Sequence, residues 1–407
     1  MSIQFSQEYL KEDLRNLLLF FKEYNIEGDF DRYSDDDQSR DNEDLLVDED
    51  TELTPWLPHS FYEVSHTISE LYDMVYEARR SRKIDEYKFI GKRVALFHID
   101  SQIQEIIHGL SLEIPTHTEI IDNQQYTLDI VEGLSSYGFK LIIDNNYNKY
   151  VPPVEDSDTF IEIRSEDNID EQVLESLVEA YLFEVKSSLN VSIHLSPRVF
   201  YEAAEDHTEY ETVPSRLRPL LRGKGIHPLL KLYNSTLSTT NEEILVLTYT
   251  KVIEYVSQTV IQQDLIKSVN KKLFSPRTLN PDANYILELS KIFEGNRNNQ
   301  KDYYSIKLTI ETCCDLIEIT SIAPHFLKYT RKLTAGSKSA EMEKAYEEVA
   351  NAISNTRNMF AHAKTNYEKK GKECPADQLN DFTKCLDILA QQIIRWFSKE
   401  DEDNRVT

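Results

Sequence analysis

Three arginine–histidine pairs in the sequence have the residue types needed for chemistry on a phosphate. In each pair four residues separate the two, and the pairs are Arg93 and His98, Arg222 and His227, and Arg357 and His362. Imidazole gains or loses a proton near neutral pH, and a guanidinium makes bidentate contacts with a phosphate group. Such a pair could move a proton while stabilising charge that develops on phosphate oxygens. The spacing alone has little specificity, because it occurs three times in one chain.

The first two pairs lack an element that would hold them together. Arg93 and His98 flank the apolar run 94–97, which predicts a strand, and strand residues five apart point to opposite faces. Arg222 and His227 lie in a segment rich in Gly and Pro, where no rigid element is expected. The third pair is therefore the best candidate.

Arg357 and His362 lie at the end of an amphipathic segment, 340–363, for which a helix is predicted. Its apolar stripe consists of Tyr346, Val349, Ala350, Ile353 and Phe360. Arg357 falls on this stripe, so its guanidinium faces a core or an interface, where an unpaired charge is costly. Either a carboxylate compensates the charge, or the stripe ends in a pocket that accepts phosphate. The candidate carboxylates are Glu254, Asp315 and Glu318.

Helical geometry also limits how the third pair can work. Asn358 and His362 are four residues apart and share a helix face, whereas Arg357 and His362 are about 140° apart on an ideal helix. A site that uses all three side chains therefore needs a helix end or a second subunit.

The sequence Arg357-Asn-Met-Phe-Ala-His362 resembles the motif of HEPN-family nucleases, in which Asn, Asp or His follows the arginine and histidine comes a few residues later. The resemblance covers about the C-terminal half of the chain, from Gly225 to Phe397. It implies a helical bundle that cleaves RNA without a metal and pairs as a homodimer, so that two motifs meet. It also implies roles in prokaryotic antiviral defence or toxin systems.

The resemblance assigns a role to each motif residue. His362 would act as acid or base for attack of the 2′-hydroxyl on the adjacent phosphate, Arg357 would stabilise the phosphorane charge, and Asn358 would orient the histidine or the phosphate. Four lysines follow the motif and would bind the RNA backbone, namely Lys364, Lys369, Lys370 and Lys372. HEPN toxins with a nucleotidyltransferase antidote usually have Tyr two positions after the histidine, and here that position is Lys364.

Two other interpretations stay open. Arg357 could pair with a bundle carboxylate while His362 caps a helix C-terminus, where a cation is favoured, which would make the protein a non-catalytic dimerisation and interaction module. Alternatively, the acidic segment 28–51 could mimic a nucleic acid, or recruit a basic partner.

The charge distribution separates the two halves of the chain. Residues 1–210 hold 17 Lys and Arg against 46 Asp and Glu, a net charge of −29, and residues 211–407 hold 28 against 25, a net charge of +3. Phosphate binding relies on Lys and Arg, so RNA is expected to bind the C-terminal half. The N-terminal half would then act as a sensor or regulator and would bind a protein trigger or inhibitor.

The fold expected is mixed, with an N-terminal α+β region and a C-terminal all-α, HEPN-like bundle. The boundaries are 1–54 for an N-terminal helix and acidic flexible segment, 55–210 for an α+β regulatory or sensor domain, 211–224 for a basic linker, and 225–400 for the bundle. Helices are expected at 61–80, 171–189, 241–263, 283–293, 302–323, 340–363 and 377–397, and strands at 94–99, 139–143, 159–164 and 191–195.

The remaining sequence features suggest a cytoplasmic protein without cofactors. The longest apolar run near the N-terminus, 17–21, is far shorter than the roughly 20 residues that span a bilayer, so no membrane association is expected. The four cysteines form no CxxC pair, and no glycine-rich phosphate-binding loop is present. We therefore expect reduced thiols, no metal site and no bound nucleotide.

Overall fold

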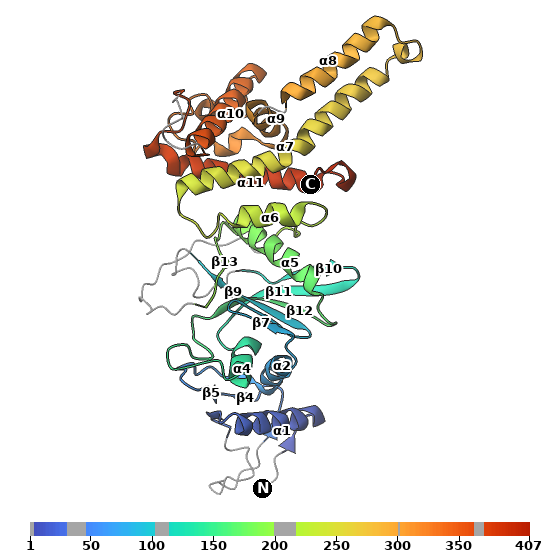
Figure 1. Cartoon of the computed structure of the whole chain (residues 1–407). Helices are drawn as coiled ribbons and strands as arrows, with labels where there is room; N and C mark the ends of the chain where they lie inside the picture. The colour runs from blue at the N-terminus through green and yellow to red at the C-terminus, as the bar shows by residue number, and fades with distance from the viewer. Residues whose placement is uncertain (1–3, 31–45, 102–113, 199–216, 300–301, 362–369) are drawn as a thin grey trace. The chain divides into compact units, whose positions relative to one another are not determined.

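The computed structural model describes residues 4–30, 46–101, 114–198, 217–299, 302–361 and 370–407. The chain splits into two compact units. The sheet unit consists of Met1–Val178 and Ser188–Pro219, and the helical unit consists of Glu179–Ser187 and Leu220–Thr407. The fold is therefore mixed, as expected, with sheets in the N-terminal region and helices in the C-terminal region (Figure 1).

An antiparallel sheet forms the centre of the sheet unit. Its strands follow the order β10 (His117–Ile121), β11 (Gln124–Glu132), β12 (Thr159–Ser165), β9 (Val94–Asp100), β8 (Lys88–Ile90) and β7 (Lys83–Ile84), and β13 (His194–Leu195) also pairs with β9. The central strands β9 and β12 are buried on both faces, which explains their nearly continuous apolar sequences. By contrast, β10 has no buried residue and β11 alternates between buried and partly exposed residues, so β11 buries only one face.

Helices cover both faces of this sheet. Helices α2 (Ile68–Arg79) and α4 (Ser136–Ile143) lie on one side, and the first half of α5 (Glu171–Glu184) lies on the other (Figure 1). Helix α1 (Glu8–Glu23) shares an apolar core with α2 and α4, to which Leu17, Leu71 and Phe139 contribute. A capping box between Thr67 and Glu70 fixes the start of α2.

Three small strand pairs complete the sheet unit around α1. They are β1 (Gln4–Phe5) with β3 (Leu46–Val47), β2 (Glu27–Gly28) with β5 (Pro55–Trp56), and β4 (Glu52–Leu53) with β6 (His66–Thr67). Val47 is fully buried in the core that α1 and α2 share. The end of the predicted flexible segment 28–51 is therefore ordered, and most of that segment, 31–45, lies outside the described residues.

Two predictions for the sheet unit are wrong. Residues 139–143 form the end of helix α4 rather than a strand, because a short, mostly apolar run has no periodicity that separates helix from strand. The helix predicted from residue 61 begins only at Ile68, where Thr67 provides the cap. The strands expected at 94–99 and 159–164 and the helix expected from 171 are confirmed.

The helical unit contains the remaining helices. They are α6 (Ile226–Asn234), α7 (Glu242–Leu273), α8 (Ala283–Asn299), α9 (Asp302–Cys313), α10 (Ser339–Ala361) and α11 (Leu379–Lys399), joined in part by short 3₁₀ turns. The predicted apolar stripe of the last helix is confirmed, since Leu379, Phe382, Leu386, Leu389, Ile393 and Phe397 are all buried. Asn241 caps α7 by accepting hydrogen bonds from the amides of Glu243 and Ile244.

The helices of this unit differ from the prediction in several ways, among them α8, which continues six residues past the predicted end at 293. Helix α7 continues ten residues past the predicted end at 263, and α6 was not predicted. Helix α9 ends at Cys313 instead of 323, because the side chain of Asp315 caps a separate 3₁₀ turn, Leu316–Ile319. None of the described helices combines the length and the apolar content needed to cross a membrane.

Candidate functional site

Arg357 lies near the C-terminal end of α10, directly before its last turn, where the buried face of the helix meets solvent. The preceding residues of the stripe, Val349, Ala350 and Ile353, are almost completely buried. The side chain of Arg357 itself keeps 29% of its surface exposed. The helix therefore places the guanidinium at the edge of the core, accessible from solvent and backed by packed side chains.

Two carboxylates from other helices face Arg357. Nη2 of Arg357 lies 3.2 Å from Oε1 of Glu254 on α7, and Nη1 lies 3.9 Å from Oδ2 of Asp302 at the start of α9. Glu254 was one of three carboxylates considered as partners, and this choice is confirmed. Asp315 instead caps the 3₁₀ turn that follows α9.

The ion pair with Glu254 is held in a partly desolvated setting. Burial raises the pKa of Glu254, and the nearby charge of Asp302 adds to this effect, whereas Arg357 and Lys251 oppose it. Burial thus disfavours the carboxylate form that Arg357 binds. A phosphate that approaches Arg357 from solvent would compete with a carboxylate whose charged form is already disfavoured.

Asn358 extends the contact network to a second face of α10. Nη1 of Arg357 donates a hydrogen bond of 2.9 Å to Oδ1 of Asn358. By helical spacing, Asn358 shares a face with Asn351 and Asn355. Nζ of Lys372 donates to Oδ1 of Asn351 at 3.2 Å, which brings one of the expected RNA-binding lysines onto this face.

The other residues of the predicted site are only partly described. His362, Lys364 and Lys369 lie outside the described residues. Lys370 is exposed, and its backbone amide donates to Glu373. Among the described residues of the predicted site, Arg357 and Asn358 are in contact, and Lys372 bonds to Asn351, seven residues before Asn358 on α10.

The two competing arginine–histidine pairs are placed much as the sequence indicated. Arg93 precedes β9, and His98 is a buried residue within that strand. Arg222 lies in the segment before α6, whereas His227 belongs to the first turn of that helix rather than to a linker. Among the described residues, no hydrogen bond or ion pair joins Arg93 to His98, whose ring contacts Ser196 and Asp158 instead.

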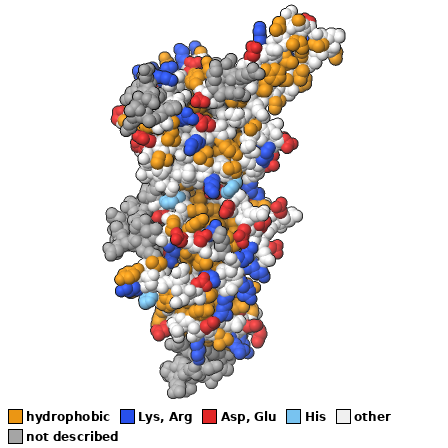
Figure 2. Space-filling view, viewed as in Figure 1, with side chains coloured by type: hydrophobic (Ala, Val, Ile, Leu, Met, Phe, Trp, Pro, Cys, Tyr) orange, Lys and Arg blue, Asp and Glu red, His pale blue; other side chains and the backbone are white. Residues whose placement is uncertain are grey.

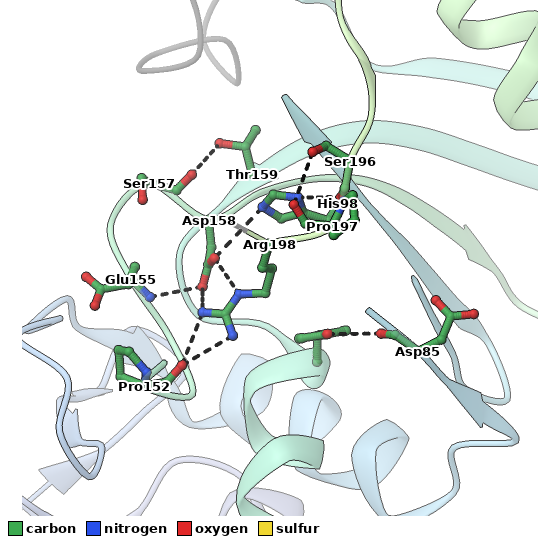
Figure 3. Close-up of polar contacts among 11 residues, drawn as sticks. Asp85, His98, Pro152, Glu155, Ser157, Asp158, Thr159, Ser196, Pro197 and Arg198 are labelled. Carbon is green, nitrogen blue, oxygen red and sulfur yellow. Dashed lines mark hydrogen bonds and ion pairs between the residues drawn. The ribbon is translucent and has the colours of Figure 1, made fainter. Parts of the chain in front are cut away.

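A second polar cluster, which sequence reasoning missed, is buried in the sheet unit (Figure 3). Arg198 and Asp158 form a bidentate pair with N–O distances of 2.7 Å and 2.6 Å, and their side chains are only 5% and 6% exposed. Arg198 also donates to the carbonyl oxygen of Pro152, and the amide of Glu155 donates to Asp158. These contacts join the segment after β13 to the loop before β12.

His98 completes this cluster. Its Nδ1 lies 2.9 Å from the carbonyl oxygen of Ser196, and its Nε2 lies 4.0 Å from Oδ1 of Asp158. Because a carbonyl oxygen only accepts hydrogen bonds, Nδ1 carries the proton and Nε2 is the atom that would gain one. Burial lowers the pKa of His98, with Arg198 adding to this effect and Asp158 and Asp100 opposing it. The cluster thus holds a neutral histidine beside a carboxylate that is already paired with Arg198. These contacts stabilise the fold, and we assign them no role in catalysis.

This lowered pKa predicts a pH dependence of stability in the sheet unit. The unfolded chain binds a proton at His98 near pH 6.5, where the folded chain does not, so the contribution to stability is present above that pH and lost as the pH falls. Burial shifts the pKa of His66 and His194 in the same direction. We expect the protection of β9 amides against hydrogen exchange, corrected for intrinsic rates, to fall between about pH 7.5 and about pH 5.5, the range in which histidine titrates. In His98→Asn the protection of the β9 amides should change less with pH. An unchanged pH dependence would show that His98 is not the group responsible.

The cysteines do not form a reactive centre. All four are free thiols, and burial raises the pKa of Cys374 and of Cys385 to about 12. Burial also raises the pKa of Cys313 and Cys314 well above the usual range. These thiols stay protonated at neutral pH and are poor nucleophiles. Within the part of the chain that the structure describes, no three His, Cys, Asp or Glu side chains are grouped as a metal site would require.

Comparison with protein-family models, with curated proteins and with solved structures found no match to this chain.

Proposed function

We propose that this protein is a metal-independent endoribonuclease whose site is formed by Arg357, Asn358 and His362 of a HEPN-like helical bundle. The observation that carries the proposal is the position of Arg357 at the end of α10. Its guanidinium is partly exposed and is held by Glu254 and Asn358. Because Asn358 orients the guanidinium, it can contact developing phosphate charge once a phosphate takes the place of Glu254.

The chemistry follows from the residues of the motif. As the 2′-hydroxyl oxygen bonds to the adjacent phosphorus, the P–O5′ bond breaks, which leaves a 2′,3′-cyclic phosphate and a 5′-hydroxyl. His362 removes or supplies the proton, because imidazole titrates near neutral pH. Arg357 stabilises the phosphorane charge, and Asn358 orients Arg357 or the phosphate. Lys372, together with Lys364, Lys369 and Lys370, binds the RNA backbone.

The acidic neighbours of Arg357 have a further consequence for activity. An RNA phosphate must replace Glu254 at the guanidinium before the site can act. Glu254 therefore lowers basal activity, which suits an enzyme kept latent until it is triggered. We propose that it serves in antiviral defence or as a toxin, and that the sheet unit acts as the sensor or regulator.

The direct test is cleavage of RNA by the purified full chain in the presence of EDTA. Wild type should release products with 2′,3′-cyclic phosphate ends, and His362→Ala should reduce cleavage by roughly 100-fold or more, as expected for loss of a general acid–base residue. His325→Ala is a matched control, because His325 is an exposed histidine of the same unit. Cleavage that persists in His362→Ala, or that requires a divalent cation, would contradict the proposal.

The second candidate function is a non-catalytic interaction protein. The specific observation in its favour is the ion pair of Arg357 with Glu254, which satisfies the arginine without any ligand. In this case the biological activity of the chain would be unchanged when Arg357 and His362 are both replaced by alanine.

A further inference from the structure

Helices α7 and α8 form an arm that extends away from the other helices of the helical unit (Figure 1). The arm consists of residues 262–299, that is, the end of α7, the 3₁₀ turn Pro276–Leu279, and α8. The chain reverses within this turn, so the two helices run antiparallel as a helical hairpin. Figure 2 shows hydrophobic side chains gathered on its surface.

The arm is rigid at its tip. Asp282 caps α8 by accepting from the amide of Tyr285 at 2.7 Å, and Arg277 donates to Asp282 at 2.8 Å. Glu288 forms ion pairs with Arg277 and with Lys272 of α7. The hydroxyl of Tyr285 donates to the carbonyl oxygen of Lys272, which ties the two helices together. The hairpin is therefore preformed.

Each arm helix has an inner apolar stripe that packs against the other helix. On α8 this stripe contains the buried Tyr285 and the half-buried Leu289 and Ile292. On α7 it contains the half-buried Leu265 and Val269. These contacts account for the hairpin itself.

A second, outer stripe on each helix has no such partner within the hairpin. Ile266 and Leu273 on α7 are 47% and 44% exposed, and Ile286 and Phe293 on α8 are 51% and 46% exposed. Each of these four residues comes directly after a residue that faces the other helix. One residue along an α-helix is a rotation of about 100°, so the outer stripe lies about 100° around each helix from the inner one. Because the helices are antiparallel, the same rotation carries both stripes to one side of the hairpin.

We name this side the outer face, and the described positions on its two stripes, from Ile266 to Leu273 on α7 and from Ile286 to Phe293 on α8, carry no charge. Between its apolar residues lie Asn270 and Ser290, both exposed and neither charged. A protein interface core is likewise depleted of charged side chains. The charged residues between 266 and 273 and between 286 and 293 lie on other faces of the helices. The outer stripes themselves therefore offer no Lys, Arg, Asp or Glu for an ion pair with an anionic lipid surface or a charged peptide.

The dimensions of the outer face fit a second copy of the same hairpin. Helix α8 has 17 residues and is roughly 25 Å long, and two helices are together roughly 20 Å wide. The face is therefore on the order of 500 Å² in projection, below the roughly 800 Å² that each partner of a standard interface buries, so its area fits a weak, concentration-dependent dimer. Two such hairpins would form a four-helix bundle, the usual way to bury a two-helix apolar face.

We propose that two copies of this chain associate through the outer faces of their α7–α8 arms. The proposal rests on the arm alone and holds whether or not the chain cleaves RNA. Each copy carries a net charge of −26, so long-range repulsion opposes association. An apolar, uncharged contact avoids adding to that repulsion, and the dimer should become tighter as salt screens it.

The test is the oligomeric state of the full chain, measured by sedimentation equilibrium over a range of concentrations. Wild type should dimerise, and Ile286→Glu, which places a charge on the outer face of each copy, should raise the dimer dissociation constant by about 100-fold or more. Leu287→Glu is the matched control. Leu287 is the next residue, is 59% exposed and points about 100° away, so its replacement should leave the dissociation constant within about threefold.

A second measurement keeps the result independent of variant folding. In wild-type protein, hydrogen exchange of the arm amides should slow as the concentration rises through the dissociation constant, while amides of α11 should not change. A wild type that is monomeric at all concentrations would overturn the proposal. So would a dimer that Ile286→Glu leaves intact, because the contact would then lie elsewhere, or an arm that gains protection only from another protein or from lipid vesicles.

Discussion

Replacing Arg357 by alanine is expected to lower the rate of RNA cleavage by roughly 100-fold to 1,000-fold, the range seen when one preorganised donor to a developing oxyanion is removed. The free energy of unfolding should fall by only about 1 kcal/mol, because both partners of the Arg357–Glu254 pair are about one-third exposed. A large loss of rate with a small loss of stability is characteristic of a residue that acts in the transition state.

The companion variant, Glu254→Gln, distinguishes this result from a structural role. Glutamine keeps the shape of the side chain and removes the charge that competes with phosphate. If Arg357 serves catalysis, Glu254→Gln should cleave RNA at least as fast as wild type, and with a lower KM. If the pair is structural, Arg357→Ala and Glu254→Gln should lower stability alike, and neither should change RNA cleavage. The rates of both variants, measured in EDTA beside thermal unfolding, therefore test the proposed site directly.

Sequence patterns predicted the elements in which local periodicity and packing agree. The stripe of α11 is buried along its whole length, and its spacing alone identified it. The partner of Arg357 was narrowed to three carboxylates because a charge on an apolar stripe needs compensation, and one of them, Glu254, makes the contact. In both cases the prediction started from the spacing of residues along a single helix, the apolar stripe of α11 or the stripe of α10 on which Arg357 falls.

Other features were not predicted, either because a local pattern was overlooked or ambiguous, or because no local pattern encodes them. The loop between β10 and β11 is Asp122–Asn123, with φ of 50° and 67°, a two-residue turn that favours a hairpin and was overlooked. The extension of α7 beyond 263 was missed because its distal part carries apolar residues on two faces, Leu265 and Val269 on one and Ile266 and Leu273 on the other, which blurs the helical period. Asp158 and Arg198 are 40 residues apart in sequence, and only the sheet brings them together.

That buried pair gives the prediction with the largest effect on stability. Asp158→Asn removes the partner of an arginine whose side chain is 5% exposed, and an uncompensated buried charge costs about 3 to 5 kcal/mol. Glu23→Gln is the matched control, since Glu23 is 55% exposed and pairs with Arg79 at 2.7 Å. Its replacement should cost less than about 1 kcal/mol.

Hydrogen exchange of the β9 and β12 amides would measure both effects in the sheet unit alone. If Asp158→Asn and Glu23→Gln lose the same amount of protection, the buried ion pair contributes no more to stability than the exposed one, and the prediction is wrong. The double variant Asp158→Leu with Arg198→Met adds a further constraint. It should recover much of the loss, because the penalty comes from leaving one buried charge unpaired, and an apolar pair leaves none. A double variant no more stable than Asp158→Asn would instead assign the loss to His98 and Glu155, which also contact Asp158.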